Sequence, residues 1–159
     1  MPSQIGDAYS MKKILCVILI LSVGLLSKSY SQTFYPNKYL QDLDEAYSSG
    51  MFRGWNANFL VPMDDPAAPA FLNVFQYMQG RVPGLMITGA GNSLRKPYVS
   101  YRSGTPVLFL DEMRVDSKLL ASIPMSDIAF IKVFRTPFSG AAGAGNGAIA
   151  VYTRDGDEE

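Results

Sequence analysis

Apolar residues recur at helical spacing in two segments of the chain. In the first segment, 38–47, Asn37 stands where an N-cap is expected and Gly50 follows as a stop signal. The second segment, 71–78, ends before Gly80, Pro83 and Gly84. The apolar positions are Tyr39, Leu40, Leu43, Ala46 and Tyr47 in the first segment and Phe71, Leu72, Val74, Phe75 and Met78 in the second. Each pattern predicts a short amphipathic helix.

Beyond residue 84 the hydrophobic period changes from helical spacing to two. Short β-branched or aromatic runs lie between turn signals at 85–88, 98–102, 107–110, 129–134 and 148–153. A short helical segment, 116–122, separates two of them. The order is not a regular βαβ repeat. We therefore predict an α+β fold, with a small mixed β-sheet and two or three short helices.

The connecting segments have the composition of turns and linkers. Residues 51–61 are rich in aromatic side chains and contain Gly54, and 62–69 carries Asp64, Asp65 and three prolines. A domain boundary near residue 66 is therefore expected. The last two predicted strands are joined by 136–147, whose glycines and alanines suit a tight turn or a close packing contact.

The N-terminal segment has the pattern of a secretory signal. Lys12 and Lys13 precede an uncharged apolar run over 14–26, which is shorter than the roughly 20 residues of a membrane-spanning helix. Ser29 and Ser31 supply small residues before a cleavage site after Ser31. We thus expect a cleaved signal peptide over 1–31. Met11 is an alternative start, in which case 1–10 are an upstream extension of the reading frame.

Charge and composition narrow the classes of function. Of the 14 Lys and Arg and the 14 Asp and Glu, three and one respectively precede residue 32, which leaves 11 basic and 13 acidic residues. The basic residues are scattered, and only Arg95 and Lys96 are adjacent, so no stripe follows a phosphate backbone. The 48% of apolar residues is typical of one globular domain. We predict no nucleic-acid partner.

The chain has no histidine and a single cysteine, Cys16, which lies inside the N-terminal apolar run. This composition excludes an intramolecular disulfide, a zinc site of thiolates or imidazoles, and activation of a nucleophile by histidine. Catalysis would depend on carboxylates, hydroxyls or lysines. We predict that the protein is not an enzyme and has no cofactor.

Three groups of residues are candidates for a functional site. Gly143, Gly145 and Ala148 match a dinucleotide fingerprint, but a predicted strand follows them where that motif requires a helix. Aromatic residues 52, 55 and 59 could stack on a sugar, although a place in the core is favoured. These residues are Phe52, Trp55 and Phe59.

Asp111, Glu112 and Asp116 form a local acidic group that could supply a pair of catalytic carboxylates. Asp111 and Glu112 follow a predicted strand, so we expect them on opposite sides of it or in its turn. Asp116 is placed to cap the helix over 116–122. Structural roles are therefore favoured, and a carboxylate-based periplasmic enzyme remains the less favoured alternative.

Four sequence blocks over 73–154 occur together in one order. The first runs from Asn73 through Gly-Arg-Val-Pro-Gly at 80–84 and into 85–87, and the second covers 99–104. The third combines Pro-Val-Leu-Phe-Leu-Asp at 106–111 with Ile-Pro-Met-Ser-Asp-Ile-Ala-Phe-Ile-Lys-Val-Phe at 123–134. The last is Gly-Ala-Gly-Asn-Gly-Ala-Ile-Ala-Val-Tyr-Thr-Arg at 143–154. Single blocks are weak evidence, but their shared order makes coincidence a poor explanation.

These blocks resemble the plug domain of TonB-dependent outer-membrane receptors, especially the large Bacteroidetes type related to polysaccharide uptake. The positions that carry the family motif are Gly80, Pro83, Gly84, Arg102, Asp111, Asp127, Gly143, Asn146, Gly147 and Thr153. Glu112 stands where the family has a glycine. No hydrophobic TonB-box segment is evident near Gln32.

The resemblance implies a division into a signal peptide (1–31), an N-terminal helix and linker (32–69), a plug-like domain (70–154) and an acidic tail (155–159). A receptor barrel would need several hundred residues after the plug, so we expect a stand-alone plug-like domain. The expected location is the periplasm or the periplasmic side of the outer membrane, peripheral to the membrane. The expected partner is an outer-membrane β-barrel protein or a TonB-type protein. The alternative is a truncated or split receptor component that still takes part in TonB-dependent nutrient import.

Overall fold

A computed structural model describes residues 37–54, 57–91, 95–102, 104–135, 138 and 145–154. All of these residues belong to one compact unit, Thr33–Glu159. The predicted α+β fold is confirmed, because the chain forms a five-stranded mixed sheet, a two-stranded sheet and a few short helices. The signal peptide, Gly143, Trp55 and the acidic tail lie outside the described residues.

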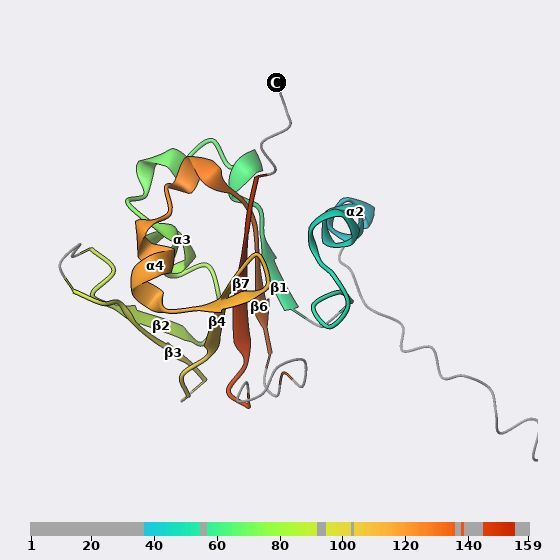
Figure 1. Ribbon diagram of the computed structural model, residues 1–159. Coiled ribbons are helices and arrows are strands. Elements are labelled where there is room, and N and C mark those ends of the chain that lie inside the picture. The colour runs from blue at the N-terminus through green and yellow to red at the C-terminus, as the bar shows by residue number, and fades with distance from the viewer. Residues whose placement is uncertain are drawn as a thin grey trace, which may run out of the picture. The chain divides into compact units, whose positions relative to one another are not determined.

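The five-stranded sheet has the strand order β1-β6-β7-β4-β5 (Figure 1). β4 and β7 are parallel, and the other neighbouring pairs are antiparallel. A separate antiparallel sheet is formed by β2 and β3. The strands are β1 (Ala57–Leu60), β2 (Leu85–Thr88), β3 (Tyr98–Tyr101), β4 (Val107–Leu110), β5 (Met113–Val115), β6 (Ile128–Phe134) and β7 (Ala148–Thr153).

The three α-helices of the described residues lie on the two sides of the five-stranded sheet. In Figure 1, α3 and α4 lie on one side of it and α2 lies on the other. The helices are α2 (Lys38–Tyr47), α3 (Val74–Met78) and α4 (Ser117–Ser122). Three 3₁₀ turns, at Pro62–Asp64, Ala68–Ala70 and Met125–Asp127, complete the described elements.

Side-chain caps fix where the helices begin. Asn37 and Asp116 cap α2 and α4, as predicted, by accepting hydrogen bonds from the backbone N–H groups of Leu40 and Leu119. The helix predicted from residue 71 begins only at Val74, because the Asn73 side chain accepts from the N–H groups two and three residues ahead. That start was therefore predicted three residues too early.

Two strands were not predicted from the sequence. β1 lies in the aromatic-rich connection and pairs with β6, and all four of its residues are only half-buried, so its burial does not alternate. β5 has three residues and is the other edge of the sheet. Segment 32–69 therefore contributes a helix and a strand to the same compact unit as 70–154.

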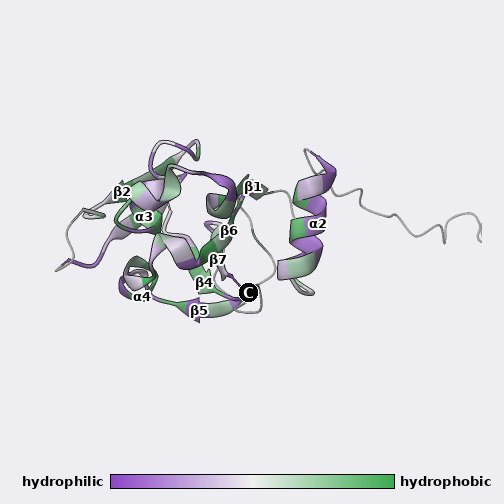
Figure 2. Ribbon diagram, turned by 90° about the horizontal axis from the view of Figure 1, so that it is seen from above, coloured by the Kyte–Doolittle hydropathy of each residue, from purple (hydrophilic) through white to green (hydrophobic). Residues whose placement is uncertain are grey.

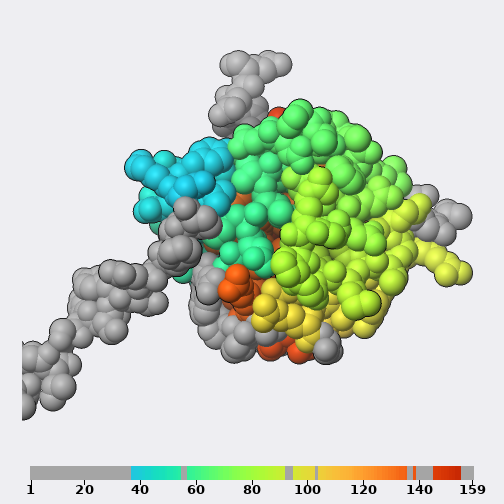
Figure 3. Space-filling model, turned by 180° about the vertical axis from the view of Figure 1, so that it is seen from behind, coloured from blue at the N-terminus to red at the C-terminus, as the bar shows by residue number. Residues whose placement is uncertain are grey.

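The sheet separates two apolar clusters. On one face, alternate strand residues such as Leu108, Ile131 and Ile149 pack with α3, α4 and the β2–β3 sheet. On the other face, Phe109, Phe130 and Tyr152 belong to an aromatic cluster. Figure 2 shows the hydrophobic colour concentrated along β6, β7 and β4. From behind, the green and yellow chain between β1 and β3 forms much of the visible surface (Figure 3).

Candidate functional site

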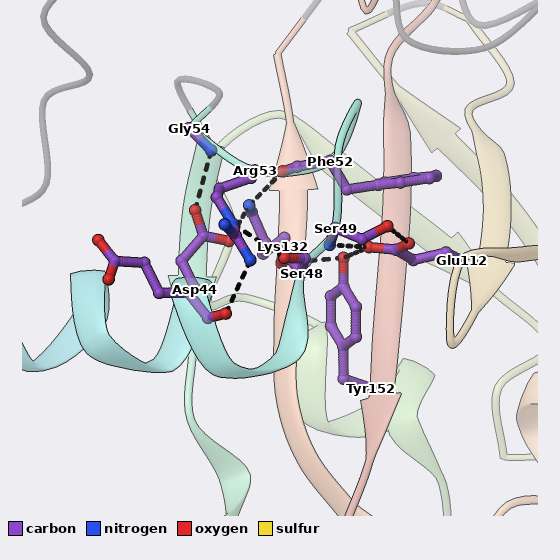
Figure 4. A network of polar contacts seen from close by, with 10 residues as sticks. Asp44, Ser48, Ser49, Phe52, Arg53, Gly54, Glu112, Lys132 and Tyr152 are labelled. Atoms are coloured by element: carbon purple, nitrogen blue, oxygen red, sulfur yellow. Dashed lines mark hydrogen bonds and ion pairs between the residues drawn. The ribbon is translucent and has the colours of Figure 1, made fainter.

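A network of polar side chains lies between α2 and the aromatic face of the sheet (Figure 4). Its centre is Lys132 of β6, whose side chain is fully buried. The Lys132 ammonium group contacts the Asp44 carboxylate of α2 and donates to the backbone carbonyl of Phe52. Asp44 is also fully buried. The pair therefore joins α2 to the middle of the sheet without contact with solvent.

The loop after α2 completes the surroundings of Asp44. The second carboxylate oxygen of Asp44 accepts a hydrogen bond from the Gly54 N–H group at 3.0 Å. The Arg53 guanidinium donates to the carbonyl of Ser48 at 3.0 Å and to that of Glu45 at 2.9 Å. These carbonyls belong to the C-terminal end of α2, where backbone acceptors lack helical partners. Arg53 thus caps the helix end that carries Asp44.

Glu112, in the turn between β4 and β5, is a further member of the network. Its carboxylate accepts from the Ser49 N–H group at 2.6 Å and from the Ser49 hydroxyl, and the Tyr152 hydroxyl lies 3.5 Å away. The Ser48 hydroxyl donates to the Tyr152 oxygen at 3.1 Å. The loop that follows α2 is therefore joined to the β4–β5 turn and to β7.

Burial governs the ionisation of this network. Burial lowers the pKa of Lys132, while the hydrogen bond and the charge of Asp44 act in the opposite direction. Burial also raises the pKa of the Tyr152 hydroxyl above its ordinary value of 10.0. A charged lysine in this position depends on its carboxylate partner, because an unpaired buried charge is strongly unfavourable.

Asp111 and Glu112 form the two-residue turn between β4 and β5. Both have positive φ angles, 45° and 66°, as in a type I′ hairpin turn. The Asp111 carboxylate accepts from the Thr153 N–H group at 2.8 Å and from its hydroxyl at 2.9 Å. The expected turn position is confirmed, and both carboxylates hold neighbouring segments. Glu112 occupies a left-handed position, which is where a glycine would be unstrained.

A second pair of motif positions meets where β2 begins and β3 ends. The Arg102 N–H group donates to the Gly84 carbonyl at 3.0 Å. A Cβ atom at Gly84 would lie 3.2 Å from Cγ of Arg102, and the φ of Gly84 is +81°. Gly80 also has a positive φ, in the turn after α3, and Pro83 stands between the two glycines.

The remaining motif positions lie at two further strand ends. Asn146 packs so closely on Gly104 that a Cβ atom at Gly104 would lie 2.2 Å from the Asn146 side chain. A Cβ atom at Gly147 would lie 2.7 Å from the Phe134 carbonyl oxygen. At the other end of β7, the Asp127 carbonyl accepts from the Arg154 N–H group at 2.9 Å. The described motif positions thus hold strand ends and do not converge on one cavity.

The dinucleotide-like motif and the aromatic candidates from the sequence have structural roles. Ala148 begins a strand, as expected, so the glycine-rich segment does not open a helix there. Phe52 is buried among the aromatic rings and Phe59 is partly buried against them, as favoured from the sequence. Among the described ranges there is no group of three or more acidic, cysteine or histidine residues placed to hold a metal ion.

Sequence reasoning missed the Lys132–Asp44 pair. The two residues are 88 positions apart, so no local spacing connects them. One signal was present: Lys132 is the only charged residue in the strand Ile-Ala-Phe-Ile-Lys-Val-Phe, in which every residue is buried. A buried lysine implies an acidic partner.

One comparison with a solved structure supports the fold. No protein-family model and no curated protein matches the chain. Among solved structures, the RagAB peptide importer in its closed-closed state matches 66% of this chain with a TM-score of 0.54 and 19% identity. The siderophore receptor PirA from Pseudomonas aeruginosa matches 62% with a TM-score of 0.48 and 16% identity.

The match spans only a small part of each of these proteins, 13% of the RagAB chain and 18% of the PirA chain. At 19% identity, the likeness to RagAB concerns the fold. In the described part of the chain, no helix combines the length and the apolar character needed to cross a membrane.

Proposed function

We propose that this protein is a stand-alone plug-like domain, a non-catalytic interaction module of the cell envelope that is associated with outer-membrane transport. The observation that carries the proposal is the fold. The fold of 66% of the chain is similar to part of a peptide importer, and four sequence blocks over 73–154 resemble the plug of TonB-dependent receptors. The blocks and the fold likeness are two separate lines of support.

The packing of the domain supports a role without an enclosing barrel. Both faces of the five-stranded sheet are covered by elements of the same chain, and the two resulting clusters include 30 buried hydrophobic residues. The core therefore does not need a partner to exclude water from the sheet. Such a domain can be exported, fold and then bind through its surface.

The side-chain chemistry supports a non-catalytic role. The Asp111 and Glu112 carboxylates accept hydrogen bonds from Thr153 and Ser49, and neither residue lines the cavity of about 650 Å³ beside β3 and β4. A catalytic pair should face a space that a substrate can enter. We propose the periplasmic side of the outer membrane as the location and a β-barrel or TonB-type protein as the partner.

Fractionation of cells that express the epitope-tagged full chain tests this proposal. The chain should sediment with the outer membrane, and the band should correspond to a chain that has lost 1–31. Detergent that dissolves the inner membrane selectively should leave it in the pellet. Recovery in the cytosolic fraction at full length would contradict the proposal. A protease that is added after the outer membrane has been permeabilised should remove the tag.

A further inference from the structure

A groove separates the β2–β3 sheet from the beginning of β4. It encloses about 650 Å³ and is open to the surface. Its walls are strand β3, the first residues of β4, and the segment in which β5 leads into α4. The residues used below are Lys96, Tyr98, Val99, Pro106, Arg114 and Asp116.

The groove exists because β3 and β4 begin as a hairpin and then separate. Tyr101 and Gly104 exchange two backbone hydrogen bonds, of 2.7 and 3.1 Å. The next pair of an antiparallel ladder on this side would be Val99 with Pro106. Proline has no N–H group to donate, and these two residues do not pair. The hairpin therefore opens at Pro106, and β3 has one edge without a neighbouring strand.

The backbone of Val99 is directed towards the groove. The Arg102 N–H group bonds to β2, whereas the Tyr101 N–H group bonds to Gly104 on the opposite side. Because backbone direction alternates along a strand, the Val99 N–H and C=O groups point away from β2. Neither group has a hydrogen-bond partner in the part of the chain that the structure describes. Val99 is only 4% exposed, so a partner would satisfy groups that have little access to water.

The charges around the groove are mainly positive. Lys96 and Arg114 line it, and Arg95 and Lys118 line the adjoining cavity, which shares Pro97 with it. Among the residues that line the two cavities, the single carboxylate is that of Asp116, 3.5 Å from the Lys96 ammonium. The exposed Arg114 has no ion pair with any described residue. A ligand that matches this surface is acidic.

We propose that this groove binds an extended acidic segment of a partner protein by β-augmentation of β3. The segment adds as a strand opposite Val99, whose N–H and C=O groups supply two main-chain hydrogen bonds independent of side-chain sequence. The neighbouring Pro97 carbonyl already accepts from the Ser117 hydroxyl at 2.7 Å. Its carboxylates face Arg114 and Lys96, and its alternate side chains contact the ring of Tyr98, which is 59% exposed. This binding site does not depend on a role in transport.

A labelled peptide of four Thr-Glu repeats with blocked ends tests the proposal against the full-length chain. Fluorescence anisotropy should show saturable binding at low ionic strength that weakens as salt is added. Arg114→Gln and Lys96→Gln should each weaken binding roughly three- to tenfold, because each removes one charge-assisted contact. The control Lys38→Gln removes an exposed charge of the same sign from α2, and should leave binding unchanged.

Two further measurements separate strand addition from simple charge attraction. A peptide with alternate backbone nitrogens methylated keeps all its carboxylates but loses its donors on one edge, and it should fail to bind. Hydrogen exchange of the Val99 amide should slow at least about tenfold when the unmodified peptide is present. Equal binding of the methylated peptide, or unchanged exchange at Val99, would overturn the proposal.

Two competitors test the sign of the ligand's charge and its chemical class. A Thr-Lys peptide of the same length should not displace the Thr-Glu peptide, since it carries the charge of the groove. An oligothymidylate should compete only weakly, because it cannot pair with a strand edge. Displacement by either competitor at the concentration of the unlabelled Thr-Glu peptide would overturn the assignment of an acidic polypeptide.

Discussion

The two faces of the five-stranded sheet are covered in different ways. The face towards α3 and α4 is aliphatic along the central strands, with Ile131, Val133, Ile149 and Val151 in contact with an apolar cluster. The face towards α2 combines aromatic rings with one buried ion pair, and the Lys132 ammonium lies 5.1 Å from the ring centre of Phe134.

The difference shows how each covering segment is held. α3 and α4 are short, so they gain their stability from apolar contacts with the sheet. α2 is bound by directional contacts from Asp44, Ser48 and Ser49, which require one position of the helix on the sheet. Apolar burial is non-directional, whereas a buried ion pair requires one geometry.

The largest effect is expected when the ion pair loses one member. Asp44→Ala leaves the Lys132 charge buried without its partner and should lower the free energy of unfolding by about 3–5 kcal/mol. Denaturant titration followed by circular dichroism measures the change. Asp42→Ala is the control, because its ion pair with Lys38 is exposed, and it should cost at most about 1 kcal/mol. Equal losses of stability in the two variants would show that the buried ion pair contributes no more than the exposed one.

Removing both charges sharpens the same comparison. The double variant Asp44→Leu with Lys132→Met replaces the buried ion pair of the α2 face with apolar side chains. It should recover most of the stability that Asp44→Ala loses, since apolar replacement of a buried pair is often neutral or stabilising. A double-mutant cycle measures the coupling between the sites. A double variant as unstable as the single one would show that the specific contacts, and not charge burial, dominate.

On the aliphatic face, a substitution lowers the stability by creating a cavity. Leu120→Ala removes a fully buried side chain of α4 and should cost about 2–5 kcal/mol. The matched control is Leu119→Ala on the same helix, where the leucine is 46% exposed and the change should be small. Thermal unfolding of both variants checks the difference. Similar midpoints would contradict the buried position of Leu120.

A smaller effect is expected at the glycine before β7. Gly147→Ala places a Cβ atom 2.7 Å from the Phe134 carbonyl oxygen at a φ of +87°, and should cost about 1–3 kcal/mol. Gly145→Ala is the control, because a Cβ atom there meets nothing within 4 Å. Denaturant midpoints of the two variants should differ. A Gly147 variant as stable as the Gly145 variant would contradict the close approach to β6.

The smallest effect concerns the outer contact of α2. The hydrogen bond from the Tyr39 hydroxyl to Asp64 raises the pKa of Tyr39 from 10.0 to about 12. Because the folded pKa lies above the unfolded one, the contribution is complete below pH 10 and is lost as the pH rises towards 12. Tyr39 is 44% exposed, so the contribution should stay below about 1 kcal/mol.

The variant Tyr39→Phe isolates this effect from the other groups that titrate at high pH. The stability difference between the natural protein and the variant should be constant below pH 10 and should shrink between pH 10 and 12. Urea titrations at several pH values measure it. A difference that grows with pH would contradict the assigned direction of the pKa shift.

The sequence predicted those elements whose signals are local. β2 and β4 follow runs of apolar residues bounded by turn residues, and Asp116 marks the start of α4. β1 and β5 were missed because short edge strands have no alternating burial or strong composition to mark them. The division into two sheets was not predicted either, because the place of Pro106 opposite Val99, where it cannot donate a ladder hydrogen bond, is known only from the fold.

The polar network could not be predicted from local sequence patterns, for a different reason. Asp44 and Lys132 belong to elements whose contact arises from the tertiary fold, and Glu112 reaches Ser49 across 63 positions. The sequence showed only that Lys132 interrupts a buried strand. Its partner could not be chosen from the acidic residues of the chain, because several of them lie on predicted helices or turns.

The most direct test of the proposed function is the composition of the complex that contains this chain in the cell envelope. Cross-linked envelopes from cells with the tagged full chain should yield, after stringent purification and mass spectrometry, a near-stoichiometric outer-membrane β-barrel or TonB-type protein. An exported protein of identical tag and size serves as the control. Recovery of the chain without either partner, at the background level of that control, would contradict an interaction module of outer-membrane transport.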